Sequence, residues 1–103
     1  MKLLISIGLI ACVTATFVQA APSAQQTCKK MVSEGRAGGK TQQQCHCMYQ
    51  VADQTLDEDI KALLFDAWYN GTNNMAALEK LPGRARVKKQ LKRMQKASVK
   101  YCS

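Results

Sequence analysis

The chain has 103 residues, and its 15 Lys and Arg residues against seven Asp and Glu residues give a formal net charge of +8. A chain of this length allows one small domain and leaves little room for a catalytic cleft. It contains no phosphate-binding glycine loop, no dinucleotide fingerprint and no Ser-His-Asp set. We therefore expect a protein that is not an enzyme and that has no cofactor.

Residues 1–20 have the pattern of an export signal. A short basic start is followed by the apolar residues 3–18, and Val18-Gln19-Ala20 places small residues where a signal peptidase cleaves. The apolar run is too short for a convincing membrane span. We therefore predict a cleaved signal peptide and an exported mature chain, periplasmic or secreted, that starts at Ala21.

A bacterial lipoprotein is the alternative for this segment. Leu9-Ile10-Ala11-Cys12 matches a lipoprotein box, in which Cys12 would become the acylated N-terminus. However, Cys12 comes early, and residues 13–18 are apolar where a lipoprotein tether is normally polar. The cleaved signal peptide remains our prediction.

Four cysteines follow the signal under either form of processing: Cys28, Cys45, Cys47 and Cys102. An even number of cysteines in a small exported protein indicates two disulfides. A domain of this size buries too little apolar surface to offset its conformational entropy comfortably, so crosslinks would add needed stability.

Helical signals continue through the rest of the chain. We predict one all-α domain over residues 21–103, a disulfide-stapled bundle of four to five helices. Thr41 and Gln44 form a predicted capping box, and Asn70-Gly71 a predicted helix stop. The expected helices cover about 24–34, 42–52, 57–70, 74–80 and 84–102.

The C-x-C sequence limits how the cysteines pair. Residues two apart on a helix point about 200° from each other, so Cys45 and Cys47 should have different partners. In an antiparallel hairpin of the first two helices, Cys28 lies level with Cys47, although its apolar face points toward Cys45. We predict that Cys28 pairs with Cys47 and that Cys45 pairs with Cys102.

The last helix is basic and amphipathic. Its eight cations come without any Asp or Glu, and they are Arg84, Arg86, Lys88, Lys89, Lys92, Arg93, Lys96 and Lys100. One narrow stripe of the helix, apolar except for a serine, consists of Val87, Leu91, Met94, Ser98 and Tyr101. We expect the stripe to pack on the rest of the domain and the eight cations to form a binding ridge.

Charge is segregated along the mature chain. Residues 21–79 contain five basic and seven acidic residues, a net charge of −2, whereas residues 80–103 contain nine basic and no acidic residues. A local positive field attracts anionic partners. We expect binding to anionic lipid, polysaccharide or an acidic protein, and we disfavour nucleic acid because of the export signal and because few aromatic residues accompany the cations.

Two alternatives remain for the function. A membrane-active cationic effector or antimicrobial protein would release the last helix into a bilayer, but that helix lacks Trp and Phe. The size and the stapled helices are also similar in a general way to periplasmic immunity and chaperone-like proteins of Gram-negative bacteria.

Other residue clusters have simpler explanations. Cys45-His46-Cys47 could suggest a metal site, but the spacing is too tight and the chain has only one His. The carboxylates of Asp57-Glu58-Asp59 are expected to stabilise the start of a helix. We expect Phe65, Trp68 and Tyr69 to belong to the core rather than to a ligand pocket.

Overall fold

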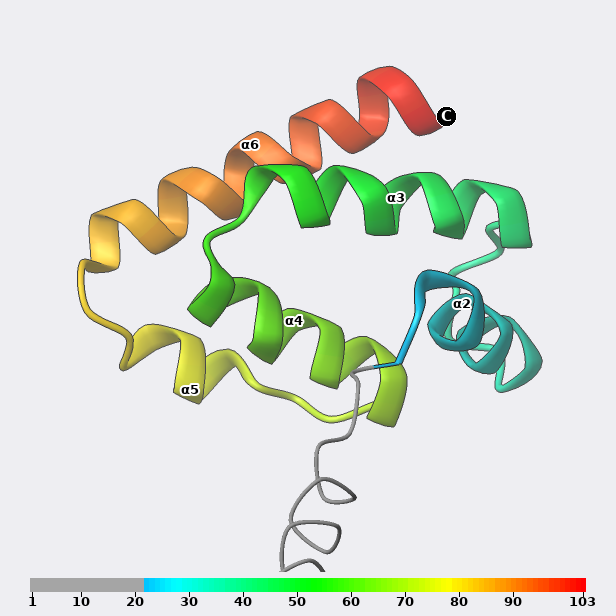
Figure 1. The fold of residues 1–103 in the computed structure, drawn as a ribbon, viewed down its shortest axis with the longest axis horizontal. Coiled ribbons are helices and arrows are strands. Elements are labelled where there is room, and N and C mark those ends of the chain that lie inside the picture. Colours follow the sequence, from blue (N-terminus) through cyan, green and yellow to red (C-terminus); the bar gives the residue numbers. More distant parts are fainter. Residues whose placement is uncertain (1–21) are drawn as a thin grey trace, which may run out of the picture.

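The computed structural model describes residues 22–103, which form five α-helices and no β-strand (Figure 1). The predicted all-α fold with disulfide-stapled helices is confirmed. The helices are α2 (Ala24–Ser33), α3 (Gln42–Thr55), α4 (Glu58–Asn70), α5 (Met75–Glu79) and α6 (Arg84–Cys102). The predicted signal peptide and the alternative role of Cys12 lie outside the described residues.

Local signals set the helix boundaries. The predicted capping box at the start of α3 is present, because the Gln44 amide donates to the Thr41 hydroxyl at 3.1 Å and the Thr41 amide donates to the Gln44 side chain at 3.0 Å. Ser23 and Gln26 form the same motif at the start of α2. Gly71, with φ 70°, ends α4 in the left-handed conformation that glycine adopts without steric cost.

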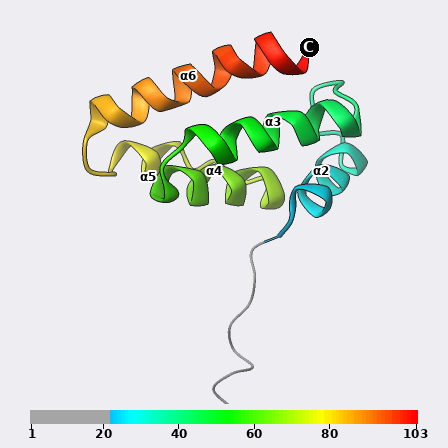
Figure 2. The same cartoon turned by 45° about the horizontal axis from the view of Figure 1, so that its top comes forward.

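The long helix α6 lies along α3, as both ribbon views show (Figures 1 and 2). Helix α2 packs against α3 and α4, and the short α5 contacts α4 and α6. Buried side chains from α3 to α6 form the core, which consists of Ala52, Leu56, Ile60, Leu78 and Val87. Leu91 and Met94 pack against this core, so most of the predicted stripe of α6 faces the rest of the protein.

The prediction is wrong at the C-terminal end of that stripe, where Tyr101 was expected to be packed. Tyr101 is 68% exposed, whereas Ser98 is buried. Cys102 forms a disulfide with Cys47, so the Cys102 side chain points toward α3. Adjacent residues of a helix point about 100° apart, so Tyr101 turns away from α3.

The predicted disulfide pairing is also wrong. Cys28 pairs with Cys45, and Cys47 pairs with Cys102, with Cα–Cα distances of 5.7 and 5.6 Å. Figure 1 shows α2 nearly end-on beside α3, so the two helices do not form the antiparallel hairpin that the prediction assumed. The expectation that Cys45 and Cys47 have different partners is correct, because α2 and α6 pack on different sides of α3.

Candidate functional site

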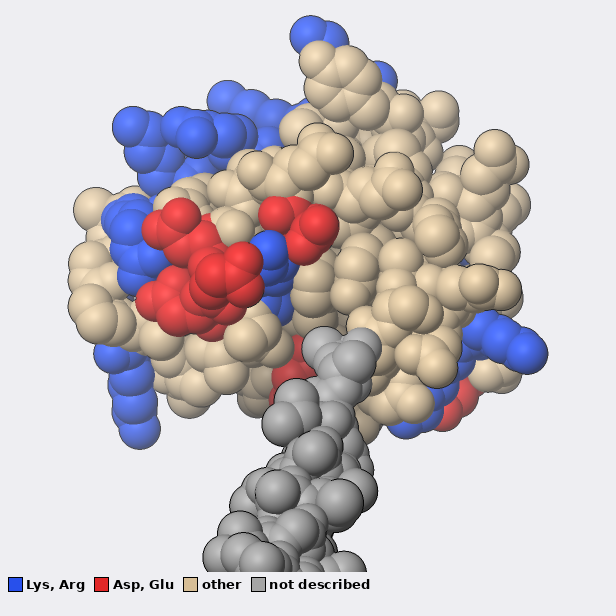
Figure 3. All heavy atoms as spheres, viewed as in Figure 1, with Lys and Arg blue, Asp and Glu red and all other residues tan. Residues whose placement is uncertain are grey.

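The solvent-facing side of α6 carries seven of the eight predicted cations. We call these seven residues the basic face: Arg84, Lys88, Lys89, Lys92, Arg93, Lys96 and Lys100. All seven are exposed, and none forms an ion pair with a carboxylate of the described residues. Figure 3 shows Lys and Arg side chains gathered over α6 at the top of the molecule.

The cations of the basic face follow regular rows along the helix. Lys88, Lys92, Lys96 and Lys100 are each four residues apart, and Lys89 and Arg93 form a neighbouring row. With a rise of about 1.5 Å per residue, successive members of a row lie about 6 Å apart along the axis. Like charges at this spacing repel each other. An anionic partner would relieve that repulsion and gain contacts with several cations at once.

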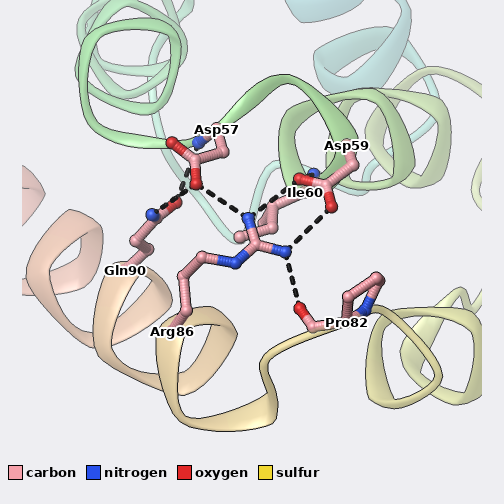
Figure 4. Close-up of polar contacts among 6 residues, drawn as sticks. All are labelled: Asp57, Asp59, Ile60, Pro82, Arg86 and Gln90. Carbon is pink, nitrogen blue, oxygen red and sulfur yellow. Dashed lines mark hydrogen bonds and ion pairs between the residues drawn. The ribbon is translucent and has the colours of Figure 1, made fainter.

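Arg86 lies apart from the basic face, which corrects its place in the predicted ridge. Its guanidinium points toward the start of α4 (Figure 4). It donates hydrogen bonds to Asp57 at 2.7 Å and to both oxygens of Asp59 at 3.1 and 2.9 Å. A fourth bond reaches the carbonyl oxygen of Pro82 at 2.7 Å. Arg86 therefore attaches α6 to α4 and is occupied within the protein.

Gln90 completes this contact one turn along α6. Its side chain accepts from the Asp57 amide at 2.8 Å and donates to the Asp57 carboxylate at 2.9 Å. The hydrogen bonds from Gln90 and Arg86 lower the pKa of Asp57, and those from Arg86 lower the pKa of Asp59. The two carboxylates in turn raise the pKa of Arg86. All three groups are therefore charged at neutral pH.

The sequence contained a weak signal for this contact. Arg86 and Gln90 are four residues apart and lie on one border of the apolar stripe, where side chains reach a neighbouring helix. Asp57 and Asp59 were expected to stabilise the start of α4, and the Asp57 side chain makes no capping hydrogen bond there. Their partners are 29 and 27 residues away in sequence, which local patterns do not reveal.

Two cations contact the four acidic residues near the start of α4. Lys61 forms ion pairs of 2.9 Å with Asp53 and with Glu58. These contacts raise the pKa of Lys61, with the Glu58 hydrogen bond as the largest cause. Together with Arg86, Lys61 offsets half of the charge of the carboxylate cluster that Figure 3 shows below α6. Lys29, Lys30, Lys40 and Lys80 also have no ion pair among the described residues, but the basic face holds the largest group of such cations.

The Cys45-His46-Cys47 segment offers no thiolate. Both of its sulfur atoms are in disulfides, one to α2 and one to the end of α6. Among residues 22–103, no group of three or more His, Cys, Asp or Glu side chains is arranged to hold a metal ion.

The aromatic residues of α4 serve two roles. Phe65 and Trp68 pack against the core, as expected. The Phe65 ring also stacks on Tyr49 with a centroid distance of 4.0 Å. Phe65 and Tyr69 line an open cleft of about 450 Å³, so the expectation that these rings belong only to the core is incomplete.

Comparisons with protein-family models, curated proteins and solved structures give no match to this chain. None of the helices in the described part of the chain is long and apolar enough to cross a membrane.

Proposed function

We propose that this protein is an exported, non-catalytic binding protein that uses the basic face of α6 to hold an anionic component of the cell envelope. The observation that carries the proposal is the set of seven exposed cations without carboxylate partners among the described residues. The two disulfides are compatible with an oxidising compartment outside the cytoplasm.

The way α6 is held supports binding at a fixed surface. Val87 is buried in the core near one end of the helix, and Cys102 is bonded to Cys47 at the other. The backbone that carries the basic face is therefore ordered before a partner arrives. Pre-ordering reduces the conformational entropy that binding must overcome.

The same attachments weigh against the membrane-active alternative. If α6 inserted in a bilayer, it would have to withdraw Val87 from the core that it shares with Leu78 of α5, while Cys102 remained tethered to Cys47. Loss of that buried surface would cost several kcal/mol before any lipid contact formed. We therefore favour a docked α6 that binds through its charges.

Vesicle binding tests the proposal. The oxidised protein should bind phosphatidylglycerol vesicles and heparin, chosen as probes of anionic lipid and polysaccharide, and should bind phosphatidylcholine vesicles much more weakly. Affinity should fall steeply between 50 and 200 mM salt, concentrations at which screening of exposed charges increases. The double variant Lys88→Gln/Lys92→Gln should bind phosphatidylglycerol about 30-fold more weakly, since each lysine near an anionic membrane contributes about 1 kcal/mol.

The matched control is Lys29→Gln/Lys40→Gln, which removes the same charge from exposed positions outside α6. It should retain most of the affinity. An equal loss in both double variants would mean that only net charge matters, and binding that is absent or insensitive to salt would contradict the proposal.

A further inference from the structure

We propose that the groove between α5 and α6 holds the acyl chain of an anionic lipid while the basic face binds the headgroup. This inference rests on the proposed function and specifies the partner. It arises from apolar surface that lies directly beside the basic face and that electrostatic binding alone does not explain.

The groove has a volume of about 610 Å³, within the range of small-molecule sites. Its apolar lining comes from two helices, with Met75 and Leu78 from α5 and Val87 and Leu91 from α6. Leu78 and Val87 are almost fully buried, at 6% and 5% exposure, and form the floor. Met75 is 57% exposed, so a large apolar side chain stands open to solvent at the groove.

The groove adjoins the basic face. Arg84 and Lys88 contribute to its lining. Lys88 and Leu91 also line a shallow depression of about 550 Å³ that includes Lys89 and Lys92. An apolar floor therefore continues directly into a surface that carries several cations.

The apolar groove and the adjoining cations together fit an anionic amphiphile better than they fit a purely anionic or a purely apolar ligand. A polysaccharide would contact the lysines and leave Met75 exposed to water. A neutral lipid would cover Met75 and leave the lysines without counter-charges. An anionic lipid satisfies both surfaces, because each methylene buried from water favours binding and each headgroup oxygen can accept from a cation.

Glu79 orients the lipid. It is the single acidic residue that lines the groove, and it lies at the end of α5, just before the connection to α6 (Figure 1). Its carboxylate would repel an anionic headgroup. The headgroup is therefore placed beside Lys88 and Lys92, and the acyl chain lies over Met75, Leu78 and Leu91.

A chain-length series tests the inference. The oxidised protein is titrated with inorganic phosphate, octyl phosphate and dodecyl phosphate, each as monomers at one ionic strength, by calorimetry. Affinity should rise by about two- to fourfold for each methylene that enters the groove, since burial of one methylene is worth up to about fourfold. Equal affinity for the three phosphates would overturn the inference.

Two carboxylate variants locate the acyl chain. Met75→Asp places a charge in the groove at an exposed position, so the core is left intact. It should weaken dodecyl phosphate binding at least tenfold. Val99→Asp adds the same charge on α6 at a residue that is 66% exposed and does not line this groove, and it should cause a smaller loss. Equal losses would contradict the assignment of the groove.

A further variant and a second ligand separate the two proposals. Met75→Gln, which introduces no charge, should also reduce the dependence on chain length. Both Met75→Gln and Val99→Asp should retain salt-dependent heparin binding. If heparin and vesicles bind with salt dependence but chain length has no effect, the groove assignment fails and the proposed function stands. If neither heparin nor vesicles bind, the proposed function fails.

Discussion

At its N-terminal end α6 is held by non-covalent contacts, whereas at its C-terminal end it is held by a covalent bond. Near the N-terminus Val87 is buried in the core and Arg86 pairs with Asp57 and Asp59. Near the C-terminus Cys102 is bonded to Cys47, while its neighbour Tyr101 is 68% exposed. One end therefore depends on ionised carboxylates and apolar burial, and the other depends on an oxidising environment.

The difference explains why the basic face is free for binding. Both attachments use residues other than the seven cations that we assign to the basic face. The helix is thus fixed at both ends without consuming the charge between them. Variants that remove one attachment at a time should show how much each attachment contributes to the position of the basic face.

The largest effect is expected from the C-terminal attachment. Cys47 and Cys102 are 55 residues apart, and in the chain-entropy model the double variant Cys47→Ser/Cys102→Ser should lose about 4 kcal/mol of unfolding free energy. Urea denaturation measures this loss. Hydrogen exchange should also accelerate in the last turns of α6, because few apolar side chains hold them.

The other disulfide provides the control. Cys28 and Cys45 are only 17 residues apart, so loss of their crosslink should cost about 3 kcal/mol by the same model. Faster exchange should then be centred on α2 rather than on the end of α6. Unchanged exchange at the end of α6 in Cys47→Ser/Cys102→Ser would mean that packing, not the disulfide, holds that end.

A smaller loss is expected from the N-terminal attachment. Arg86→Met keeps much of the apolar stem and removes the guanidinium, so it should lower the melting temperature at pH 7 by less than either disulfide variant. The loss of stability is limited because Arg86, Asp57 and Asp59 are partly exposed, and water and salt screen their charges.

The effect of Arg86→Met on the melting temperature should depend on pH. Asp57 and Asp59 have a lowered pKa in the folded protein, so their contacts contribute stability above the ordinary aspartate pKa of about 3.9. This contribution is lost as the pH falls through the lower folded-state values. The difference in melting temperature between the parent protein and Arg86→Met should therefore shrink as the pH is lowered from 5 toward about 2. Arg84→Met, at an exposed position without an ion pair, should show no such convergence, and a matching profile would contradict the role of Arg86.

The elements of the fold were predictable because their signals are local. Thr41 with Gln44 identified the start of α3, and Asn70-Gly71 identified the end of α4. Helical periodicity placed Val87, Leu91 and Met94 on the buried side of α6. Each of these signals involves residues within one or two helical turns of each other, and tertiary packing did not override them.

The features that failed depend on how helices cross. The pairing of Cys28 was decided by the angle between α2 and α3, which the spacing of cysteines does not specify. The separation of Arg86 from the basic face was decided by the position of α4, and the exposure of Tyr101 by the disulfide of its neighbour. By contrast, the sequence alone identified the seven cations of the candidate binding surface. Residues 80–103 contain nine basic and no acidic residues, so these cations have no carboxylate nearby in the sequence with which to pair.

A gain in stability, rather than a loss, is expected between the two attachments. Ser98 is 9% exposed, and its hydroxyl oxygen is buried with no hydrogen-bond partner among the described residues. A buried polar group without a partner is destabilising, so Ser98→Ala should raise the unfolding free energy by roughly 0.5–1 kcal/mol. Urea denaturation measures the gain. Ser33→Ala is the control, because the Ser33 hydroxyl is exposed and donates to the Lys30 carbonyl at 3.0 Å, and no gain is expected there.

The sign of the Ser98 effect distinguishes two descriptions of α6. A gain would mean that Ser98 adds no polar contact to α3, so that beyond Met94 the Cys47–Cys102 disulfide is the main attachment of α6. A loss would mean that the hydroxyl forms a bond that holds α6 at a third point. In that case the basic face would stay in place even when the Cys47–Cys102 disulfide is absent, and Cys47→Ser/Cys102→Ser should bind phosphatidylglycerol vesicles as well as the parent protein does.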